Sequence, residues 1–393
     1  MTVGFLQETP GSRTARIARA LTDAGHTCHL LTRNEPRMMA DAFASITRWQ
    51  TPHDYFRALC TPEMQACDVW HVHLGLLTEW LAPTAALYRT GKGPRIVLDA
   101  RDLDSLTPGL VSCEQHGQVI REFVTAEELA SFACAEGVLY VSEQCQQISR
   151  VLHHPPDQQA LIYSYVTAAE LPDLPAPHTR AGVVYAGHVE DAGGNDYRDW
   201  GASFGVFGQA WDFHCYPIST RATPEVVAAG YRLRGVKMHG ILPESKLLAE
   251  LTRYRWALVG FDQPFPLGEV AAPNKLFEAV AAGCPVLVLN SKQAGEMVER
   301  HGIGLVARDA VELVRLVAEC SEERWMEMAA KVAKLRHQWT QEAQRNRLES
   351  LYKKVCNRPL RRSEWLNSGQ TVYDWRCSEL VYWPIQLPEV AQR

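Results

Sequence analysis

The most informative local pattern in this 393-residue chain is the stretch Leu267-Gly268-Glu269-Val270-Ala271-Ala272-Pro273-Asn274-Lys275-Leu276-Phe277-Glu278-Ala279-Val280-Ala281-Ala282-Gly283-Cys284-Pro285-Val286. Pro273 and Asn274 can open a helix, because proline is tolerated in the first helical turn. Gly283 and Pro285 are typical of the end of a helix. The pattern therefore predicts a helix over Lys275–Ala282, followed by a strand over Val286–Leu289.

The start of this helix can bind an anion, because the free N–H groups and the positive end of the helix dipole favour a phosphate. Glu278 lies one turn further on, where its carboxylate can accept two hydrogen bonds from a vicinal diol such as that of ribose. Lys275 lies on the same side of the helix and can contact a phosphate or pair with Glu278. From these residues alone, an ordinary amphipathic helix with a surface ion pair is the alternative.

Outward from this stretch, strand-like and helix-like runs alternate along most of the chain. The first half predicts a helix over Thr14–Ala24 and strands over Thr2–Leu6, Thr27–Leu31, Val69–Val72, Ile96–Leu98, Val138–Val141 and Leu161–Tyr165. The second half predicts further strands over Gly182–Tyr185, Phe204–Phe207, Phe213–Tyr216 and Trp256–Gly260, and a strand with a turn over Val236–Gly240. It also predicts helices over Pro243–Tyr254, 309–319 and 321–355. This alternation is typical of parallel sheets whose two faces are covered by helices.

The length and a proline-rich stretch predict two domains. At roughly 100–200 residues per domain, two is the natural number for this chain. Leu171–Pro177 holds three prolines in seven residues and suits a semi-rigid linker. We therefore expect a first domain at 1–170, a linker at 171–178, a second domain at 179–355 and a tail at 356–393. The tail contains several tryptophans and is expected to pack on the first domain, with a membrane-facing role as the alternative.

Composition excludes several classes of protein. The chain is 46% hydrophobic and 22% charged, and it contains no apolar run long enough for a transmembrane helix. Its first residues do not resemble a signal peptide. The 11 cysteines form no C-x-x-C pair, which argues against a disulfide scaffold or a zinc ribbon and favours the cytoplasm. A net charge of −5 gives no global basic surface for nucleic acid, although a local patch stays open.

The stretch quoted first resembles the donor-site signature of GT-B glycosyltransferases, especially family 4, in which a Pro-x-Lys-x-x-Glu-Ala-x-x-x-Gly-x-Pro-Val run recurs. Segments in matching order over about 1–340 also resemble strand ends of that family, namely Asp68–His73, Leu98–Asp102, Gly137–Glu143, Val183–Gly187 and His239–Glu244. The resemblance implies an α/β protein of GT-B architecture, with two Rossmann-like doubly wound domains facing a central cleft. It also implies transfer of a sugar from a UDP- or GDP-type donor to a hydroxyl acceptor, with retention of configuration and without a required metal or other cofactor.

The resemblance assigns donor-binding residues in three places. Glu278 would hold the donor ribose, and Lys275 would lie near the phosphates or sugar, flanked by Asn274 and Leu276. Gly187 and His188 end the strand that opens the second domain. In the loop Gln7–Thr14, Gly11 lets the backbone approach a ligand, Ser12 can donate a hydrogen bond and Arg13 lies beside them. This loop is neither a Walker loop nor a G-x-G-x-x-G fingerprint, and a simple capped turn is its alternative.

Two departures from the family pattern concern charge. The family usually places two acids eight residues apart, but Val270 stands eight before Glu278 and the acid is displaced to Glu269, our candidate catalytic carboxylate. The family also commonly carries an Arg and a Lys after the Val183–Gly187 strand, where this chain has no Arg or Lys before Arg198. His188, Arg198 or Lys275 must then neutralise the diphosphate, or the site is altered, because unpaired phosphate charges are costly.

Histidines supply the remaining catalytic candidates. His71 and His73 alternate along a strand end, so they point to one face of the sheet. His73 is nearer the strand end and is our candidate, with a buried core histidine as the alternative for either. His116 is a further candidate, because family members often keep a His-Gly pair at this point. Asp102-Leu103-Asp104 is a D-x-D tripeptide, but we expect no metal site there.

The sequence leaves the acceptor and two alternative functions open. A glycan, a lipid-linked sugar, a small metabolite or a modified DNA base can each supply the acceptor hydroxyl, and nucleic acid is not favoured. A sugar-nucleotide epimerase on the same architecture needs acid–base carboxylates that we cannot place. A catalytically idle GT-B-like subunit that binds a partner is the other alternative, and the missing Arg/Lys pair favours it somewhat. The oligomeric state is unknown.

Overall fold

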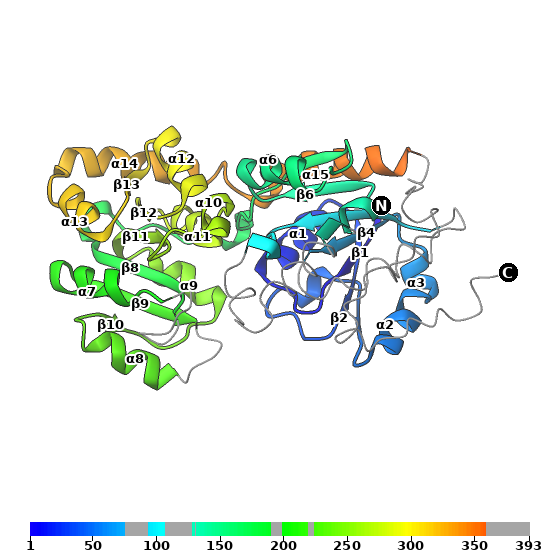
Figure 1. Cartoon of the computed structure of the whole chain (residues 1–393), viewed down its shortest axis with the longest axis horizontal. Coiled ribbons are helices and arrows are strands. Elements are labelled where there is room, and N and C mark those ends of the chain that lie inside the picture. Colours follow the sequence, from blue (N-terminus) through cyan, green and yellow to red (C-terminus); the bar gives the residue numbers. More distant parts are fainter. Residues whose placement is uncertain (75–92, 107–127, 130, 190–198, 219–223, 359–393) are drawn as a thin grey trace.

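The computed structural model of the protein describes residues 1–74, 93–106, 128–129, 131–189, 199–218 and 224–358. Two lobes lie side by side, and each is built on its own twisted parallel sheet with helices on both faces (Figure 1). The expected tail, 359–393, lies outside the described residues.

The first lobe contains a seven-stranded sheet in the order β3-β2-β1-β4-β5-β6-β7. Its strands are β1 (Thr2–Leu6), β2 (Thr27–Thr32), β3 (Ser45–Arg48), β4 (Val69–His73), β5 (Arg95–Ala100), β6 (Gly137–Tyr140) and β7 (Gln159–Leu161). Its α-helices are α1 (Ser12–Thr22), α2 (Pro52–Leu59), α3 (Pro62–Gln65) and α6 (Glu143–Leu152), with 3₁₀ turns η1 (Ala40–Ala42) and η3 (Asp104–Leu106). Central strands β1 and β4 are buried almost throughout, as expected of a sheet covered on both faces.

The second lobe contains a six-stranded sheet in the order β10-β9-β8-β11-β12-β13. Its strands are β8 (Ala181–His188), β9 (Phe213–Ile218), β10 (Lys237–Met238), β11 (Tyr254–Gly260), β12 (Val286–Leu289) and β13 (Gly304–Ala307). Its helices are α7 (Gly201–Ala210), α8 (Pro224–Arg232), α9 (Glu244–Leu251), α10 (Pro266–Val270), α11 (Asn274–Ala281), α12 (Lys292–His301), α13 (Ala310–Ala318) and α14 (Glu322–Leu335). The 3₁₀ turns η5 (Ala168–Glu170) and η6 (Pro177–Thr179) lie on the connection between the lobes.

Both sheets are doubly wound, which confirms the predicted architecture. Every strand pairing in them is parallel. In the first lobe, successive strands are added on one side of β1 up to β3 and then on its other side from β4 onward, so the strand order reverses between β1 and β4. In the second lobe the strand order reverses in the same way between β8 and β11. Ligands of such sheets bind beyond the carboxyl ends of the strands at these points.

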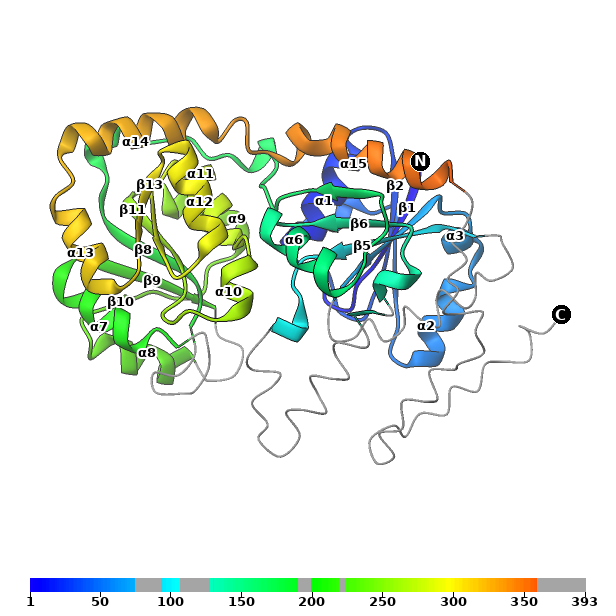
Figure 2. The same ribbon diagram turned by 45° about the horizontal axis from the view of Figure 1, so that its top comes forward.

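The last described helix returns to the first lobe. α15 (Gln341–Cys356) packs Leu348, Tyr352 and Val355 into the core around β1 and β5, while α14 stays on the second lobe (Figure 2). The prediction of one helix over 321–355 was therefore wrong, because the chain crosses between lobes at 336–340 and Thr340 caps a new helix. The predicted domain bounds stay a proposal, and α15 packs against α1 and against strands β5, β6 and β7 of the first lobe.

Two predicted strands also differ in the structure. Phe204–Phe207 lies in helix α7, where residues three apart share a face and both phenylalanines enter an aromatic core beside Trp200. That packing outweighs the low helix propensity of the glycines in α7. The strand predicted over Leu161–Tyr165 ends at Leu161, because beyond it the Tyr163 N–H donates to the Gln344 side chain of α15 instead of to a neighbouring strand.

The two crossings between the lobes are joined to each other. Val166 and Thr340 form a parallel bridge, and the Gln341 N–H donates to the Val166 carbonyl at 2.9 Å. Tyr165 stacks on Trp339 with ring centroids 5.5 Å apart, and Phe277 of α11 packs edge-on against both rings. Helix α11 therefore packs directly against the hinge between the lobes.

Among the described residues, no helix is both long and apolar enough to cross a membrane.

Candidate functional site

The carboxyl ends of the central strands meet between the lobes. In the first lobe, Gly11 follows β1, His73 ends β4 and Arg101 follows β5. Ser142, which follows β6 and caps α6, donates a hydrogen bond across the interface to the Val270 carbonyl of α10. The start of α6 after β6 and helix α10 after β11 thus meet in the same interlobe region.

Helix α6 of the first lobe and α12 of the second hold this region closed. The buried Gln293 donates to Glu143 at 2.8 Å and accepts from the Gln144 N–H at 3.1 Å. Phe265, Leu267 and Val270 add an apolar contact against the first lobe. These hydrogen bonds of the buried Gln293 join α6 to α12 across the interface between the lobes.

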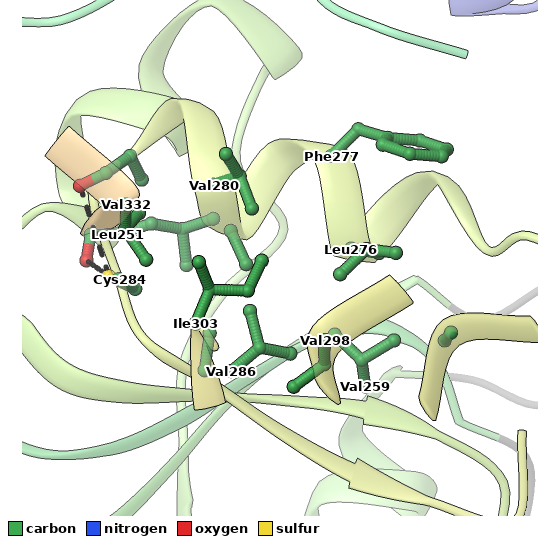
Figure 3. Close-up of a cluster of buried hydrophobic side chains, with 14 of the residues drawn as sticks. Leu251, Val259, Leu276, Phe277, Val280, Cys284, Val286, Val298, Ile303 and Val332 are labelled. Carbon is green, nitrogen blue, oxygen red and sulfur yellow. Dashed lines mark hydrogen bonds between the residues drawn. The ribbon is translucent and has the colours of Figure 1, made fainter. Parts of the chain in front are cut away.

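Helix α11 is fixed by its apolar face. Figure 3 shows Leu276 and Val280 directed from α11 into the core above β12, where Val286 and Ile303 meet them. Leu276 is fully buried and its N–H donates to the Pro273 carbonyl, so its side chain is a core residue that orients the helix. Pro273 precedes the helix without a side-chain cap, and the half-buried Asn274 and Lys275 form its first turn.

Glu278 is a buried carboxylate that faces two cations. The Lys275 Nζ donates to its Oε2 at 3.0 Å, and the Arg16 guanidinium of α1 lies 3.9 Å from its Oε1. Burial acts to raise the pKa of Glu278, but the charges of Lys275 and Arg16 and the Lys275 hydrogen bond together hold it below its ordinary value. A small cavity lies beside this pair, lined by Val184, Ala186, Leu251, Ala257, Leu258, Lys275, Glu278 and Ala279. Glu278 is therefore ionised and lies at an interface of the two lobes.

Arg16 is oriented by a third carboxylate. Its Nε and Nη2 donate to both oxygens of Glu170 at 2.8–3.0 Å, and Glu170 itself accepts from Thr167 at the start of the linker. Its remaining nitrogen, Nη1, is buried and donates to no hydrogen-bond acceptor among the described residues. Burial raises the pKa of Glu244, at the start of α9, against the opposing charge of Arg16.

The glycine loop divides into an open part and a buried part. Gly11 precedes α1, and a side chain there would approach only the Arg101 guanidinium, 3.9 Å away, among the described residues. Ser12 is mostly buried. Arg13 is 1% exposed and forms a fork with Asp99, in which its Nε and Nη2 donate at 2.8 Å, and its Nη1 donates to the Ile162 carbonyl at 2.7 Å. These bonds make Arg13 a support for the loop rather than a side chain open to a ligand, and its predicted donor contact stays a prediction.

The two histidines of β4 have different surroundings. His71 lies between Asp99 and Tyr352 of α15, at 3.1 and 2.7 Å, and belongs to the buried Arg13 network. His73 donates through its Nδ1–H to the Leu74 carbonyl at 3.0 Å, and its Nε2 has no partner among the described residues. Burial, and next the charge of Arg101, lower the pKa of His73 to about 4, so its ring is neutral near pH 7. Of the two rings, only that of His73 has a nitrogen without a hydrogen-bond partner in the described part of the chain.

The remaining candidates are placed as follows. Glu269 lies on α10 with an exposed side chain. Gly187 lies against the side chain of Tyr185, because a Cβ at position 187 would meet the Tyr185 hydroxyl. That hydroxyl donates a hydrogen bond to the His188 carbonyl at 2.9 Å. His116 and Arg198 lie outside the described residues, as does the side chain of Asp104. Within the described ranges, no group of three or more His, Cys, Asp or Glu side chains can hold a metal ion.

Sequence reasoning interpreted Asp99, Arg101 and Asp102 as cleft residues or an internal ion-pair set, but it missed Arg16 and the pairing of Asp99 with Arg13. Arg13 and Arg16 are both buried on α1, although arginine is seldom buried. The sequence feature that could have indicated their burial is their i, i+3 spacing on the same side of the helix as Ile17 and Ala20. Their partners Asp99, Glu170 and Glu278 lie 86 to 262 residues away, and no local pattern connects them.

Comparison with known proteins assigns a class. Residues 227–346 match the family described as glucosyltransferase 3-like, C-terminal domain. Sucrose-phosphate synthase from Thermosynechococcus elongatus is similar in structure, with a TM-score of 0.64 and 16% identity over 90% of this chain and 99% of that one. Anabaena HepE in complex with UDP gives a TM-score of 0.65 and 14% identity over 90% and 100% of the two chains. WaaG, a glycosyltransferase of lipopolysaccharide biosynthesis, gives 0.57 and 15% over 90% and 98%.

No curated protein sequence matches the chain. The fold and the matched region define the protein as a glycosyltransferase of GT-B architecture, and confirm the resemblance given above. More particularly, the part of its second lobe that carries α9 to α14, including Lys275 and Glu278, lies within the glucosyltransferase 3-like region.

Proposed function

We propose that this protein transfers a sugar from a UDP-sugar to a hydroxyl acceptor, with the nucleotide on the second lobe and the acceptor on the first. The observation that carries the proposal is Glu278, a buried and ionised carboxylate that lies beside a lysine, one turn into a helix whose start has no side-chain cap. A buried carboxylate is costly unless it has a function or full pairing, and the vicinal diol of ribose is a suitable partner. Uridine is chosen because HepE is described in complex with UDP and with UDP-glucose.

The diphosphate would lie at the start of α11. The N–H groups of the first turn, including that of Asn274, and the Lys275 ammonium supply positive charge. From the first lobe, Gly11 leaves room for the backbone to approach, and Arg101 lies beside it. We propose that Arg101 supplies part of the charge that the family usually places after β8, where this chain has His188 instead.

Transfer would proceed with retention and without a metal, as hydrogen bonds and dipoles stabilise the departing diphosphate. His73 would act at the sugar or acceptor through its available Nε2, as a neutral ring. His116 stays a further catalytic candidate. Glu269 is exposed in this arrangement and would approach the sugar only from the solvent side.

Release of nucleoside diphosphate tests this function. The protein is incubated with UDP-glucose, UDP-galactose or GDP-mannose, with and without simple sugar acceptors, and with EDTA in parallel. Acceptor-dependent release of UDP that EDTA leaves unchanged is the expected result. Conversion of one UDP-sugar into another would favour the epimerase, and absence of binding to any nucleotide sugar would favour the idle subunit.

Glu278→Gln tests the ribose assignment. The substitution keeps the size of the side chain but removes the charge, and hydrogen bonds to charged groups contribute about 1.5–3 kcal/mol. We expect UDP affinity, measured by calorimetry, to fall roughly 10- to 100-fold. Glu299→Gln, an exposed position on α12, is the control and should bind UDP as the wild type does. Equal affinity of all three proteins would refute the placement of the ribose.

A further inference from the structure

Arg16 is the buried cation whose position the proposed donor chemistry does not yet use. It lies on α1 of the first lobe, yet its side chain reaches Glu278 of the second lobe. Two of its nitrogens are bound to Glu170, so the guanidinium cannot rotate without losing three hydrogen bonds. The third nitrogen, Nη1, is buried in a residue that is 1% exposed, and no acceptor among the described residues lies within hydrogen-bond distance.

The distance between Nη1 and the carboxylate of Glu278 suits one bridging hydroxyl group. Nη1 and the Glu278 Oε1 lie 3.9 Å apart, too far for a hydrogen bond between them. An oxygen placed beside the pair can lie about 2.8 Å from both at once, accepting from Nη1 and donating to Oε1. A hydroxyl is the group that both accepts and donates in this way.

The charge around Arg16 favours a neutral ligand group there over a phosphate. Two cations, Arg16 and Lys275, face three carboxyl groups, Glu170, Glu244 and Glu278, and their charges interact. A dianionic phosphate would be repelled by the carboxylates, whereas a sugar hydroxyl bonds to both signs of charge. The Oε2 of Glu244 is also buried without a hydrogen-bond partner in the described chain, which leaves a second polar atom in the same surroundings.

We propose that Arg16 is a specificity-determining residue that donates to one ribose hydroxyl of the donor nucleotide, so that the two lobes recognise the ribose together. This inference rests on the proposed function, because it takes Glu278 as the ribose carboxylate. The contact makes ribose recognition depend on the closed arrangement of the lobes, since α1 and α11 belong to different sheets. A nucleotide lacking that hydroxyl would leave Nη1 and Glu278 Oε1 unsatisfied, which disfavours deoxynucleotides.

Calorimetric titration with UDP, 2′-deoxy-UDP and 3′-deoxy-UDP tests this inference on the full chain. The wild type should bind one of the two deoxy analogues roughly 10- to 100-fold more weakly than UDP. In Arg16→Lys, which keeps the charge but not the planar fork, that ratio should shrink by about 5-fold or more. The affinity for the weaker analogue itself should change little. Arg19→Gln is the matched control, because Arg19 lies one turn further along α1 and pairs with Asp23 and Asp41 at the surface.

The outcomes separate this inference from the proposed function. If wild-type protein binds UDP but Arg16→Lys weakens all three nucleotides by the same factor, Arg16 only joins the lobes and the inference is wrong. If the wild type binds no UDP, the proposed function fails and the inference falls with it. Should Arg16→Lys not fold, a crystal structure of the wild type with UDP decides. A ribose oxygen within about 3.2 Å of Nη1 supports the contact, and a separation that excludes any hydrogen bond overturns it.

Discussion

Asp99→Asn is the substitution that most directly tests how the first lobe holds its loop after β1. Asp99 is fully buried and accepts hydrogen bonds from two nitrogens of Arg13 at 2.8 Å and from His71 at 3.1 Å. Asparagine has the same shape but one carbonyl oxygen and no charge. The substitution therefore leaves the buried guanidinium of Arg13 without its counter-charge.

The expected loss in the free energy of unfolding is large for a substitution that replaces one carboxylate oxygen by an amide group. Breaking a buried ion pair by removing one partner costs about 3–5 kcal/mol, because the other charge stays buried. A typical domain has a free energy of unfolding of about 5–15 kcal/mol. Relative to the middle of that range, the substitution would remove about a third or more of the free energy of unfolding of the first lobe. For a domain of this size, each kcal/mol lowers the midpoint of thermal unfolding by about 2–4 °C, so a fall of roughly 6–20 °C is expected.

The effect also depends on pH with a definite sign. Burial acts to raise the pKa of Asp99, but the Arg13 charge and the hydrogen bonds from His71 and Arg13 hold it well below its ordinary value. The folded pKa lies below that of the unfolded chain, so the stabilisation is fully present above the unfolded pKa and is lost as the pH falls through the folded pKa. The difference between wild type and variant should therefore be greatest near neutral pH and shrink in strong acid.

Scanning calorimetry at pH 7.5 and at decreasing pH is the assay, with Asp102→Asn as control. Asp102 pairs with Arg101 at the half-exposed edge of the same segment, where such pairs contribute about 0–1 kcal/mol. A loss of less than about 1 kcal/mol for Asp99→Asn, or a loss equal to that of the control, would refute the assignment of Arg13 and Asp99 as the support of the loop.

Four further predictions each concern a single position. The pKa of His73 is about 4 in the folded chain, below the pKa of histidine in the unfolded chain. Between pH 6.5 and 4 the folded chain therefore binds fewer protons than the unfolded chain, so its free energy of unfolding decreases as the pH falls through this range. His73→Asn should flatten the dependence of the urea midpoint on pH there, and an unchanged slope would contradict the burial of the ring. Gly260 has φ +122°, and a side chain would strike the Leu289 carbonyl oxygen, so Gly260→Ala should unfold the second lobe at lower urea. Gly205→Ala, within α7 and facing open space among the described residues, should instead raise stability by about 0.5–1 kcal/mol. Trp339→Ala should lower the free energy of unfolding by about 3–5 kcal/mol, measured by denaturant titration, because it removes a buried ring from the hinge.

The parallel sheets could be predicted because their signals are local. Thr2–Leu6 and Val286–Leu289 are short apolar runs bounded by turn residues, and the structure gives both strands the same bounds as the sequence did. The helix at Phe204–Phe207 was missed because an apolar run of this length fits either a strand or a buried helix. Which one forms was decided by the aromatic residues that surround it, and they come from other parts of the chain.

The site was predictable in part. The pattern around Glu278 placed the carboxylate and Lys275 on one side of a helix, and the structure joins them at 3.0 Å. Arg16 was not predicted, because its contact with Glu278 exists only when two sheets face each other across the interlobe region. Arg13 was predicted beside a ligand because it lies close to Gly11 in the sequence. In helix α1, however, Arg13 lies four residues before Ile17 and therefore on the same buried face of the helix.

The ion pair between Lys275 and Glu278 was first the alternative to a donor site, and the structure shows why the two interpretations are compatible. Glu278 is 5% exposed, and without ligand its charge is balanced by Lys275 on one side and by Arg16 on the other. Neither contact satisfies it fully, because Arg16 lies beyond hydrogen-bond distance and Glu170 holds it there. Among the described residues, Glu278 thus has one bonded oxygen and one oxygen that faces a donor without an acceptor. This pairing keeps the carboxylate ionised and buried, yet leaves an acceptor for a hydroxyl. The ion pair therefore does not compete with the donor site, since it keeps the carboxylate charged until a ribose hydroxyl completes its hydrogen bonds.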